Sequence, residues 1–161
     1  RQKLDLIKTT QHDHLRHSQS EQSMLKAPFT DTPYIPNISH ILGALSIYDL
    51  ENTVGEELRK YDPNNAQERE KIIRDFIIKD LLYLSYRHRY YLILELEKAL
   101  KTPKYNFAKE FESDYDEHIT MAWDETEIDD PRLFFADILR LANEEWKDDL
   151  YKASLEDQST W

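Results

Sequence analysis

The residues best suited to chemistry are carboxylates, and they gather in one stretch of the chain. Between Glu110 and Asp130 the sequence holds ten Asp and Glu residues and no Lys or Arg. Residues 110–161 carry a net charge of −13, whereas residues 1–109 carry +2. Carboxylates at this density attract basic surfaces, because the fields of many like charges add up over a whole face. The pattern therefore predicts a surface that meets something basic.

The same stretch can also be interpreted as a solvated helix face, which is what most charge runs are. That alternative costs stability, since like charges four residues apart on a helix repel by roughly a few tenths of a kcal/mol each. A binding face is the preferred interpretation, with Tyr115 as a candidate anchor because interface hot spots favour Tyr and Trp. The candidate partner-binding residues are Asp114, Tyr115, Asp116, Glu117, Asp124, Glu125, Glu127, Asp129 and Asp130.

Two other patterns suggest metal binding, and neither fits well. An EF-hand loop beginning at Asp114 would place Ile119 where the sharp turn needs Gly, and His118 where an oxygen ligand belongs. Three histidines fall between residues 12 and 17, but only two of them would share a helix face, and the chain has no Cys and no HExxH motif. We therefore expect no metal and no cofactor.

Arg87-His88-Arg89 is the most chemical-looking cluster in the rest of the sequence. Cationic donors beside aromatic planes can hold phosphate or stack bases, and together with Glu95 they could serve a ribonuclease. The excess of carboxylates in the chain favours another explanation, in which these side chains pair with the acidic C-terminal helices. No Walker loop, GxSxG motif or Rossmann fingerprint occurs. The sequence predicts a protein that is not an enzyme.

Composition excludes several classes of protein. The chain has 161 residues, of which 40% are apolar and 12% aromatic, so it can build a core and is unlike a disordered acidic tail. Only 2 Gly argue against tight hairpins and phosphate loops. The absence of Cys fits a reducing compartment, and no apolar run is long enough to predict a membrane span. We expect a cytoplasmic protein.

Hydrophobic spacing predicts an all-α fold built around one long helix. Asn65 can cap its start, and neither Gly nor Pro interrupts the chain before Pro103. This helix, over about residues 66–101, is apolar nearly all round in its middle, which is typical of a central helix; polar residues at 85–89 allow a kink. A shorter helix is predicted over residues 38–62, where the following proline ends it; a restart at Ser46, whose spacing to Asp49 suits a cap, is the alternative.

Two further helices are predicted in the acidic part. Apolar residues recur every four positions from Phe107 to Trp123, tracing one ridge of a helix over about residues 104–122. Asp130 followed by proline is a strong helix start, and the last helix would reach about residue 155. The elements together predict a single-domain irregular bundle of four to five helices.

The chain is expected to divide into three parts. Residues 1–27 form a polar N-terminal arm or a loosely docked helix. Residues 28–37 form a linker that proline interrupts three times. Residues 38–161 form the helical domain, in which residues 110–161 are the acidic part.

Two functional hypotheses remain open. In the first, the chain is an acidic protein-binding module, a stoichiometric inhibitor that covers the basic active-site groove of a nuclease toxin. Immunity proteins share this general profile, and the similarity is one of class only. In the second, the chain is a non-catalytic helical adaptor subunit of a larger protein assembly, with the tyrosine-rich long helix as its interface. Direct binding of nucleic acid is not expected, because phosphates require a net basic surface.

Overall fold

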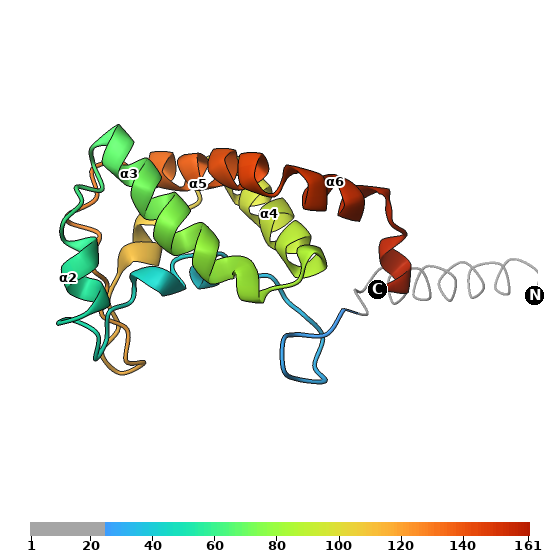
Figure 1. The fold of residues 1–161 in the computed structure, drawn as a ribbon, viewed down its shortest axis with the longest axis horizontal. Helices are drawn as coiled ribbons and strands as arrows, with labels where there is room; N and C mark the ends of the chain where they lie inside the picture. The colour runs from blue at the N-terminus through green and yellow to red at the C-terminus, as the bar shows by residue number, and fades with distance from the viewer. Residues whose placement is uncertain (1–24) are drawn as a thin grey trace, which may run out of the picture. The chain divides into compact units, whose positions relative to one another are not determined.

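The computed structural model describes residues 25–161 and confirms the all-α class. Within these residues there are five α-helices, several short 3₁₀ or π segments and three isolated β-bridges, but no sheet (Figure 1). The chain divides into two units, one comprising Pro36–Ser154 and the other comprising residues 1–35 together with 155–161. All nine candidate partner-binding residues belong to the first, which we call the helical unit.

The first long helix begins where the sequence predicts. Asn65 accepts hydrogen bonds from two backbone N–H groups in the first turn of α3 (Ala66–Ile72), which satisfies donors that have no partner inside a helix. The helix then widens into a π segment, η3 (Ile73–Ile78), and tightens into a 3₁₀ turn, η4 (Leu81–Tyr83). Both segments keep isoleucines or leucines buried in the core. The predicted start is confirmed, but the pitch of the helix changes twice.

The continuous helix predicted over residues 66–101 is wrong, because the chain breaks at Leu84-Ser85. Both residues have extended backbone, and α4 (Tyr86–Leu100) starts after them in a different direction (Figure 1). The hydroxyl of Ser85 accepts a hydrogen bond from the N–H of His88 at 3.4 Å, a local bond that competes with helix continuation. Leu84 buries its side chain in the core. Capping and burial together turn the expected kink into a full break.

Shorter elements replace the helix predicted over residues 38–62. They are η1 (Ile38–His40), η2 (Gly43–Leu45) and α2 (Val54–Leu58). Between η2 and α2 the backbone pairs with a distant segment, where the N–H of Ile47 donates to the carbonyl of Thr120 at 2.7 Å. A continuing helix would need that donor for itself. The hydrophobic pattern thus located buried positions here but not their secondary structure.

The last predicted helix forms two helices. Asp130 caps α5 (Pro131–Glu145) by accepting a hydrogen bond of 3.0 Å from an N–H in the first turn. The helix ends at Trp146, whose backbone leaves helical geometry while its ring is buried. α6 (Lys147–Leu155) then follows. The predicted start is confirmed, and a buried tryptophan at the junction divides the rest.

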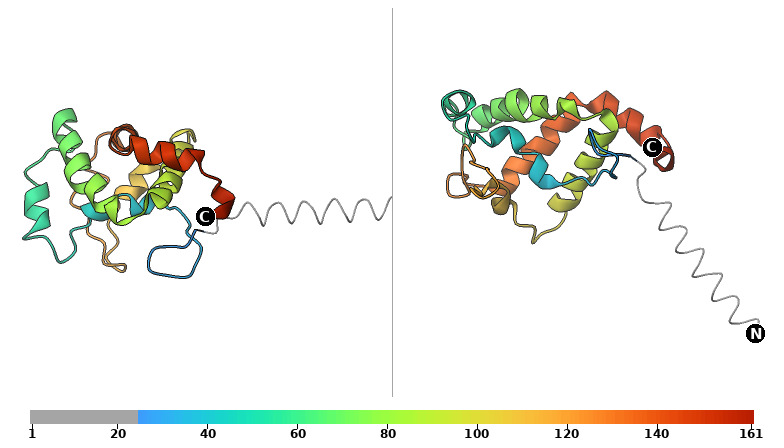
Figure 2. Two further views of the ribbon diagram at one scale, coloured as in Figure 1. Left: turned by 45° about the vertical axis from the view of Figure 1, so that its right-hand side comes forward. Right: turned by 90° about the horizontal axis from the view of Figure 1, so that it is seen from below.

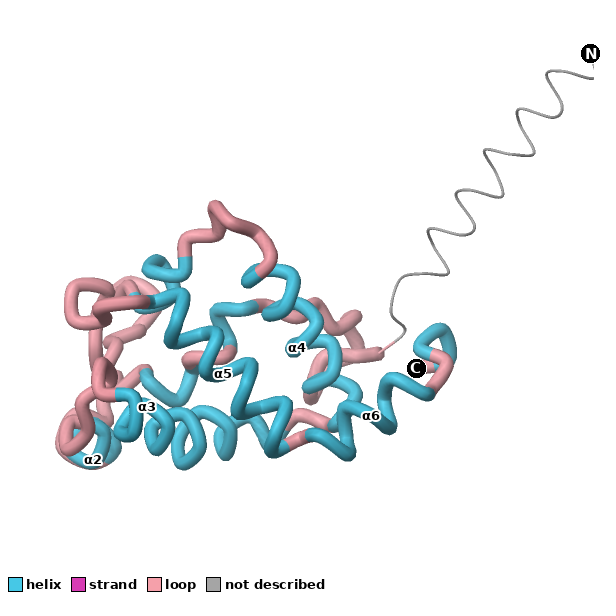
Figure 3. The backbone as a smooth tube through the Cα atoms, turned by 90° about the horizontal axis from the view of Figure 1, so that it is seen from above, coloured by secondary structure: helices cyan, strands magenta, loops and turns pink. Residues whose placement is uncertain are grey.

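α5 is the central element of the helical unit. It packs against α3, η3, α4 and the 3₁₀ helix η5 (Phe107–Phe111), and it runs between α3 and α4 in Figures 2 and 3. Phe111 meets Phe134 and Phe135 of α5 at ring-centroid distances of 5.3 and 5.8 Å. The core therefore forms around α5, because the break in the expected central helix leaves two segments that both pack on it.

The second unit is described in residues 25–35 and 155–161. Its first segment closes a turn by a backbone hydrogen bond from Ala27 to Thr32 of 2.8 Å, with Phe29 in left-handed backbone geometry (φ 63°) inside it. Most of the predicted arm of residues 1–27 lies outside the described residues. The arm and the linker therefore stay predictions. Every helix within residues 25–161 is too short or too polar to cross a bilayer.

Candidate functional site

The helix predicted over residues 104–122 is wrong beyond η5. The chain extends and doubles back in a hairpin, in which Asp114 and Ile119 exchange backbone hydrogen bonds of 2.9 and 2.8 Å. The carboxylate of Asp114 accepts from the N–H groups of Asp116 (3.2 Å) and Glu117 (3.4 Å). An aspartate bonded in this way stabilises a turn in preference to a helix. The four-residue spacing therefore did not report a continuous helix.

This hairpin forms without glycine, contrary to what the shortage of Gly led us to expect. His118 supplies the left-handed backbone geometry of the turn (φ 56°), which only a small minority of residues other than glycine adopt. Its ring contacts that of Tyr48 at a centroid distance of 4.8 Å. Contact between the rings helps to offset the cost of the unfavourable backbone geometry.

A buried segment, residues 121–123, fixes the base of the hairpin. The N–H of Ala122 donates to the carbonyl of Leu45 at 2.8 Å, and the N–H of Met121 donates to Oγ of Ser113 at 3.1 Å. Trp123 is buried, so it belongs to the core and not to an exposed aromatic surface. The hairpin and the loop that follows both leave this base as irregular chain (tan in Figure 2).

The second acidic loop, residues 124–130, is also held by local bonds. Asp124 accepts hydrogen bonds from the N–H of Thr126 at 2.8 Å and from its hydroxyl at 2.5 Å. These bonds to the charged form hold the pKa of Asp124 below its ordinary value of 3.8. Asn64 reaches across to bond the backbone of Glu127 (2.8 Å) and Asp129 (3.0 Å). The loop thus has a defined shape without being helical.

The nine candidate residues fall into two groups. The side chains that hold turns or caps by accepting backbone N–H groups are Asp114, Asp124, Glu127 and Asp130. The exposed side chains that make no hydrogen bond or ion pair with any described residue are Tyr115, Asp116, Glu117, Glu125 and Asp129. The second group is therefore available to a partner, and the first group shapes the loops that present it.

Counter-charges are absent from both acidic loops. Across residues 25–161, none of the ten carboxylates between Glu110 and Asp130 forms an ion pair with Lys, Arg or His. The hairpin tip adds apolar surface, since Tyr115 is 74% exposed. An exposed aromatic ring among unneutralised carboxylates is suited to binding a basic protein surface.

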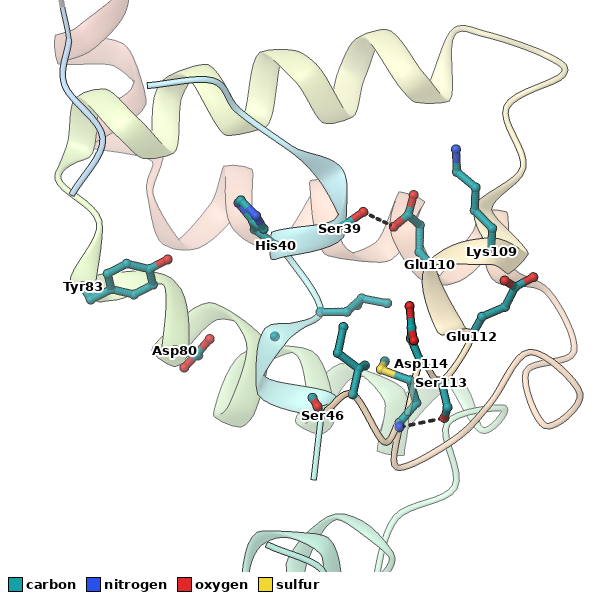
Figure 4. A pocket seen from close by; sticks show the side chains of 14 residues that line it. Ser39, His40, Ser46, Asp80, Tyr83, Lys109, Glu110, Glu112, Ser113 and Asp114 are labelled. Carbon is teal, nitrogen blue, oxygen red and sulfur yellow. Dashed lines mark hydrogen bonds between the residues drawn. The ribbon is translucent and has the colours of Figure 1, made fainter. Parts of the chain in front are cut away.

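A groove beside the hairpin was missed by the sequence analysis. It encloses about 610 Å³, and its lining comes from η1, η2, η4 and the segments 109–114 and 119–121. Figure 4 shows Asp80 and Tyr83 on one side and Glu112 and Asp114 on the other. Only Asp114 was a candidate residue. The rest come from distant parts of the chain, so no local spacing could have brought them together.

Glu110 borders this groove, but its carboxylate is already engaged. The hydroxyl of Ser39 donates to it at 2.7 Å and that of Tyr105 at 2.8 Å. Burial raises the pKa of Tyr105 above its ordinary value, and the adjacent Glu110 raises it further. The phenol therefore stays protonated and continues to donate. These bonds tie η1 to the start of the acidic segment.

Arg89 pairs with a C-terminal helix, as the sequence predicts. Its Nη2 lies 2.9 Å from a carboxylate oxygen of Asp149 in α6, and its guanidinium lies 5.0 Å from the ring centroid of Trp146. His88 bonds through Nδ1 to the hydroxyl of Ser85 at 2.6 Å. The buried Arg89 therefore has a structural task at the junction of α5 and α6.

Within the described part of the chain, no three His, Cys, Asp or Glu side chains come together in a way that could hold a metal ion. The histidines between residues 12 and 17 lie outside it. Comparison of the chain with protein-family models, with curated proteins and with solved structures finds no match. Function is therefore inferred from the side chains and their surroundings.

Proposed function

We propose that this chain is a non-catalytic, acidic protein-binding module that inhibits a nuclease toxin domain stoichiometrically, as immunity proteins do. The observation that supports this best is that the carboxylates of the acidic loops have no cationic partner within the described residues. The loops of residues 112–119 and 124–130 present carboxylates that no Lys or Arg within residues 25–161 neutralises. A nuclease domain carries a basic groove for nucleic acid, and such a groove would supply the missing charges.

The loops are suited to rapid and specific capture. Turn bonds made by Asp114 and Asp124 fix their backbone before any partner arrives, so less conformational freedom is lost on binding. Unpaired carboxylates steer a basic partner towards the site over a distance of about one Debye length, roughly 8 Å at physiological salt. The proposal places the chain in the cytoplasm, where it would protect nucleic acid from the toxin.

The tip of the hairpin provides an anchor for the complex. Tyr115 is exposed there. Tyr48, whose ring contacts that of His118, and Ile119, which pairs with Asp114 in the hairpin, are also exposed. A tyrosine inserted into a partner, with carboxylates such as Asp116 and Glu117 on either side, matches the usual composition of an interface hot spot. We therefore assign affinity mainly to Tyr115 and association rate mainly to the surrounding charge.

The test measures association kinetics with a charge-reversed variant. The full chain is used as bait to capture its partner from the source organism, and the purified partner is then mixed with the triple variant Asp116→Lys, Glu117→Lys and Glu125→Lys. The association rate constant should fall by roughly tenfold or more, because steering is lost. Added salt should slow association of the unmodified chain in the same direction.

A matched control reverses three carboxylates outside the loops, Glu51→Lys, Glu56→Lys and Asp75→Lys, which are exposed and unpaired with any described cation. It changes the net charge by the same amount and should slow association much less. The captured partner should also be a nuclease that the unmodified chain inhibits in a one-to-one complex. An association rate constant that changes neither with added salt nor with reversal of the loop charges would contradict the proposal.

The adaptor hypothesis is favoured by one separate observation. Phe29 is 97% exposed and has a positive φ within a closed turn, a strained arrangement for a bulky residue that is often found where a ligand or partner is held. If the chain is an adaptor, Phe29→Ser should abolish partner binding, and the binding should be insensitive to salt. If it is an inhibitor, the same substitution should leave the association rate unchanged.

A further inference from the structure

The groove beside the hairpin combines an apolar wall with unpaired carboxylates. Leu42 and Met121 line it as buried side chains, and Ile119 lines it while partly exposed. Asp80 and Glu112 lie across the groove from each other (Figure 4). Apolar and charged walls facing one space are suited to an occupant that is itself part apolar and part charged.

Asp80 and Glu112 have no cation of their own. In the described chain neither side chain forms an ion pair or a hydrogen bond. Lys109 also lines the groove, but its Nζ lies 4.8 Å from the ring centroid of Tyr105 and pairs with no carboxylate. Desolvation raises the pKa of Asp80 above its ordinary value, and a cation beside it would favour the charged form of the carboxylate.

Gly43 widens the groove beside Asp80, although its backbone does not require glycine. Its φ is not positive, and a Cβ placed there would approach no atom closer than 3.8 Å, the nearest being Oδ2 of Asp80. Glycine in a helical position destabilises a protein relative to alanine. Neither packing nor backbone geometry explains this residue. A glycine here is explained if a ligand occupies the free space next to the carboxylate of Asp80.

We propose that the groove receives one lysine or arginine side chain from the protein that the acidic loops bind. The aliphatic stem lies along Leu42, Ile119 and Met121, and the charged head lies at Asp80 beside Gly43, while Glu112 adds negative charge at the other side of the groove. The apolar wall favours such a side chain over a bare cation, which would make no use of it, and the surplus carboxylates disfavour an anionic or neutral side chain. The inference rests on the proposed function for the identity of the partner.

Tyr83 adds a contact at the side of the groove. Its ring is largely exposed and lies on the same side as Asp80 in Figure 4. A cation that enters beside an aromatic ring is attracted to the negative face of that ring. The groove thus offers a lysine or arginine head the carboxylate of Asp80 and the ring of Tyr83, and it offers the stem an apolar surface.

The test uses single-residue probes and the full, isotope-labelled chain. It is titrated with N-acetyl-arginine methylamide, with N-acetyl-lysine methylamide and with uncharged N-acetyl-norleucine methylamide, while backbone amide NMR signals are followed. The two charged probes should shift the amides of Gly43, Ser113 and Met121 to saturation. Dissociation constants should be millimolar, because so small a probe makes few contacts. The norleucine probe should shift them much less.

Two variants test the assignment within the groove. Gly43→Leu fills the space, and the double variant Asp80→Asn with Glu112→Gln removes the charge; each should weaken probe binding by roughly tenfold, or 1.4 kcal/mol. The double variant keeps the test decisive if Gly43→Leu does not fold. The matched control, Glu51→Gln with Asp75→Asn, should bind as the unmodified chain does. Absence of saturable shifts, or equal shifts with norleucine, would overturn the proposal.

Binding assays of the variants with the captured partner test this inference separately from the proposed function. If loop charge reversal impairs capture but Gly43→Leu and the double variant bind the partner with unchanged affinity, the groove inference is wrong and the proposed function stands. If the probes bind in the groove but loop charge reversal has no effect on capture, the groove stands and the proposed function fails. We expect both sets of variants to weaken the complex, the loop set mainly in association rate and the groove set mainly in dissociation rate.

Discussion

Two acidic regions of the helical unit differ in whether their carboxylates form ion pairs. On α5, Asp137 lies 2.8 Å from Nε of Arg69, and Glu144 lies 2.8 Å from Nη2 of Arg74. In the loops of residues 112–119 and 124–130, no carboxylate has a cationic partner among the described residues. Both regions are dense in carboxylates, so what distinguishes them is the position of the arginines.

Apart from Arg140 of α5 itself, the arginines of the paired region come from the segments that flank α5. Arg69 and Arg74 belong to α3 and η3, and Arg74 also pairs with Glu70 and with Glu145. Arg89 of α4 pairs with Asp149 of α6. These bonds join both parts of the broken helix to the C-terminal helices. The paired carboxylates thus stabilise the fold, whereas the unpaired ones have no such role within the described chain.

The largest effect should come from breaking a buried pair. Arg69 is 8% exposed and also donates to the carbonyl of Pro63. Arg69→Ala leaves the partly buried Asp137 with only the half-exposed Arg140, at 3.6 Å, as a cationic partner. It should lower the free energy of unfolding by up to about 3 kcal/mol, measured by urea denaturation. Arg140→Ala removes a half-exposed arginine from the same network and should cost less than about 1 kcal/mol.

This pair of variants can contradict the comparison. If Arg69→Ala and Arg140→Ala destabilise the protein equally, burial does not set the strength of the α5 ion pairs. The distinction between a structural and an available carboxylate would then lose its energetic basis. The same would hold if reversing loop charges such as Glu125→Lys destabilised the protein as much as Arg69→Ala does.

Local capping signals in the sequence predicted two helix starts correctly. Asn65 and Asp130 both cap helices where expected, because a cap depends on bonds within a few residues. Apolar periodicity also found core residues such as Phe107 and Phe111. Apolar periodicity failed where contacts between distant residues determine the backbone conformation. The cap made by Ser85 and the burial of Leu84 end one predicted helix. The hydrogen bond between Ile47 and Thr120 prevents a second one.

The candidate site was predicted in part for the same reason. The acidic run is a local feature, and the structure leaves the side chains of Tyr115 and of four candidate carboxylates both exposed and without a hydrogen bond or ion pair to any described residue. The sequence could not show that Asp114 turns the chain, since an aspartate can equally lie on a helix. Nor could it show the groove, because Gly43, Asp80 and Glu112 meet only through the fold.

Neutralising the loops should hardly affect stability. The variant Asp116→Asn, Glu117→Gln, Glu125→Gln and Asp129→Asn removes like charges that have no internal partner. Its free energy of unfolding should be unchanged or raised by a few tenths of a kcal/mol in total, roughly the size of exposed charge interactions. Urea denaturation at low and high salt would measure this, and the stability difference from the unmodified chain should shrink as salt screens the repulsion. A loss of more than about 1 kcal/mol would show that these carboxylates have structural partners after all.

The smallest effect concerns Asp124, which is held by neutral donors and by no cation. Its lowered pKa comes from the hydroxyl and N–H of Thr126, so Thr126→Val should raise that pKa towards 3.8, as followed by NMR titration. Because the folded pKa is depressed, the stabilisation is present above the unfolded pKa and is lost as the pH falls through the folded value. Asp157, whose pKa is lowered by Ser159 in the same way, is the matched case, and Ser159→Ala should raise its pKa similarly. Neutral donors leave a carboxylate charged without cancelling its field, and that is the property a surface needs if it is to stay attractive to a basic partner. An Asp124 pKa that does not respond to Thr126→Val would mean that some cation holds it, and the loop would then belong with the paired carboxylates of α5.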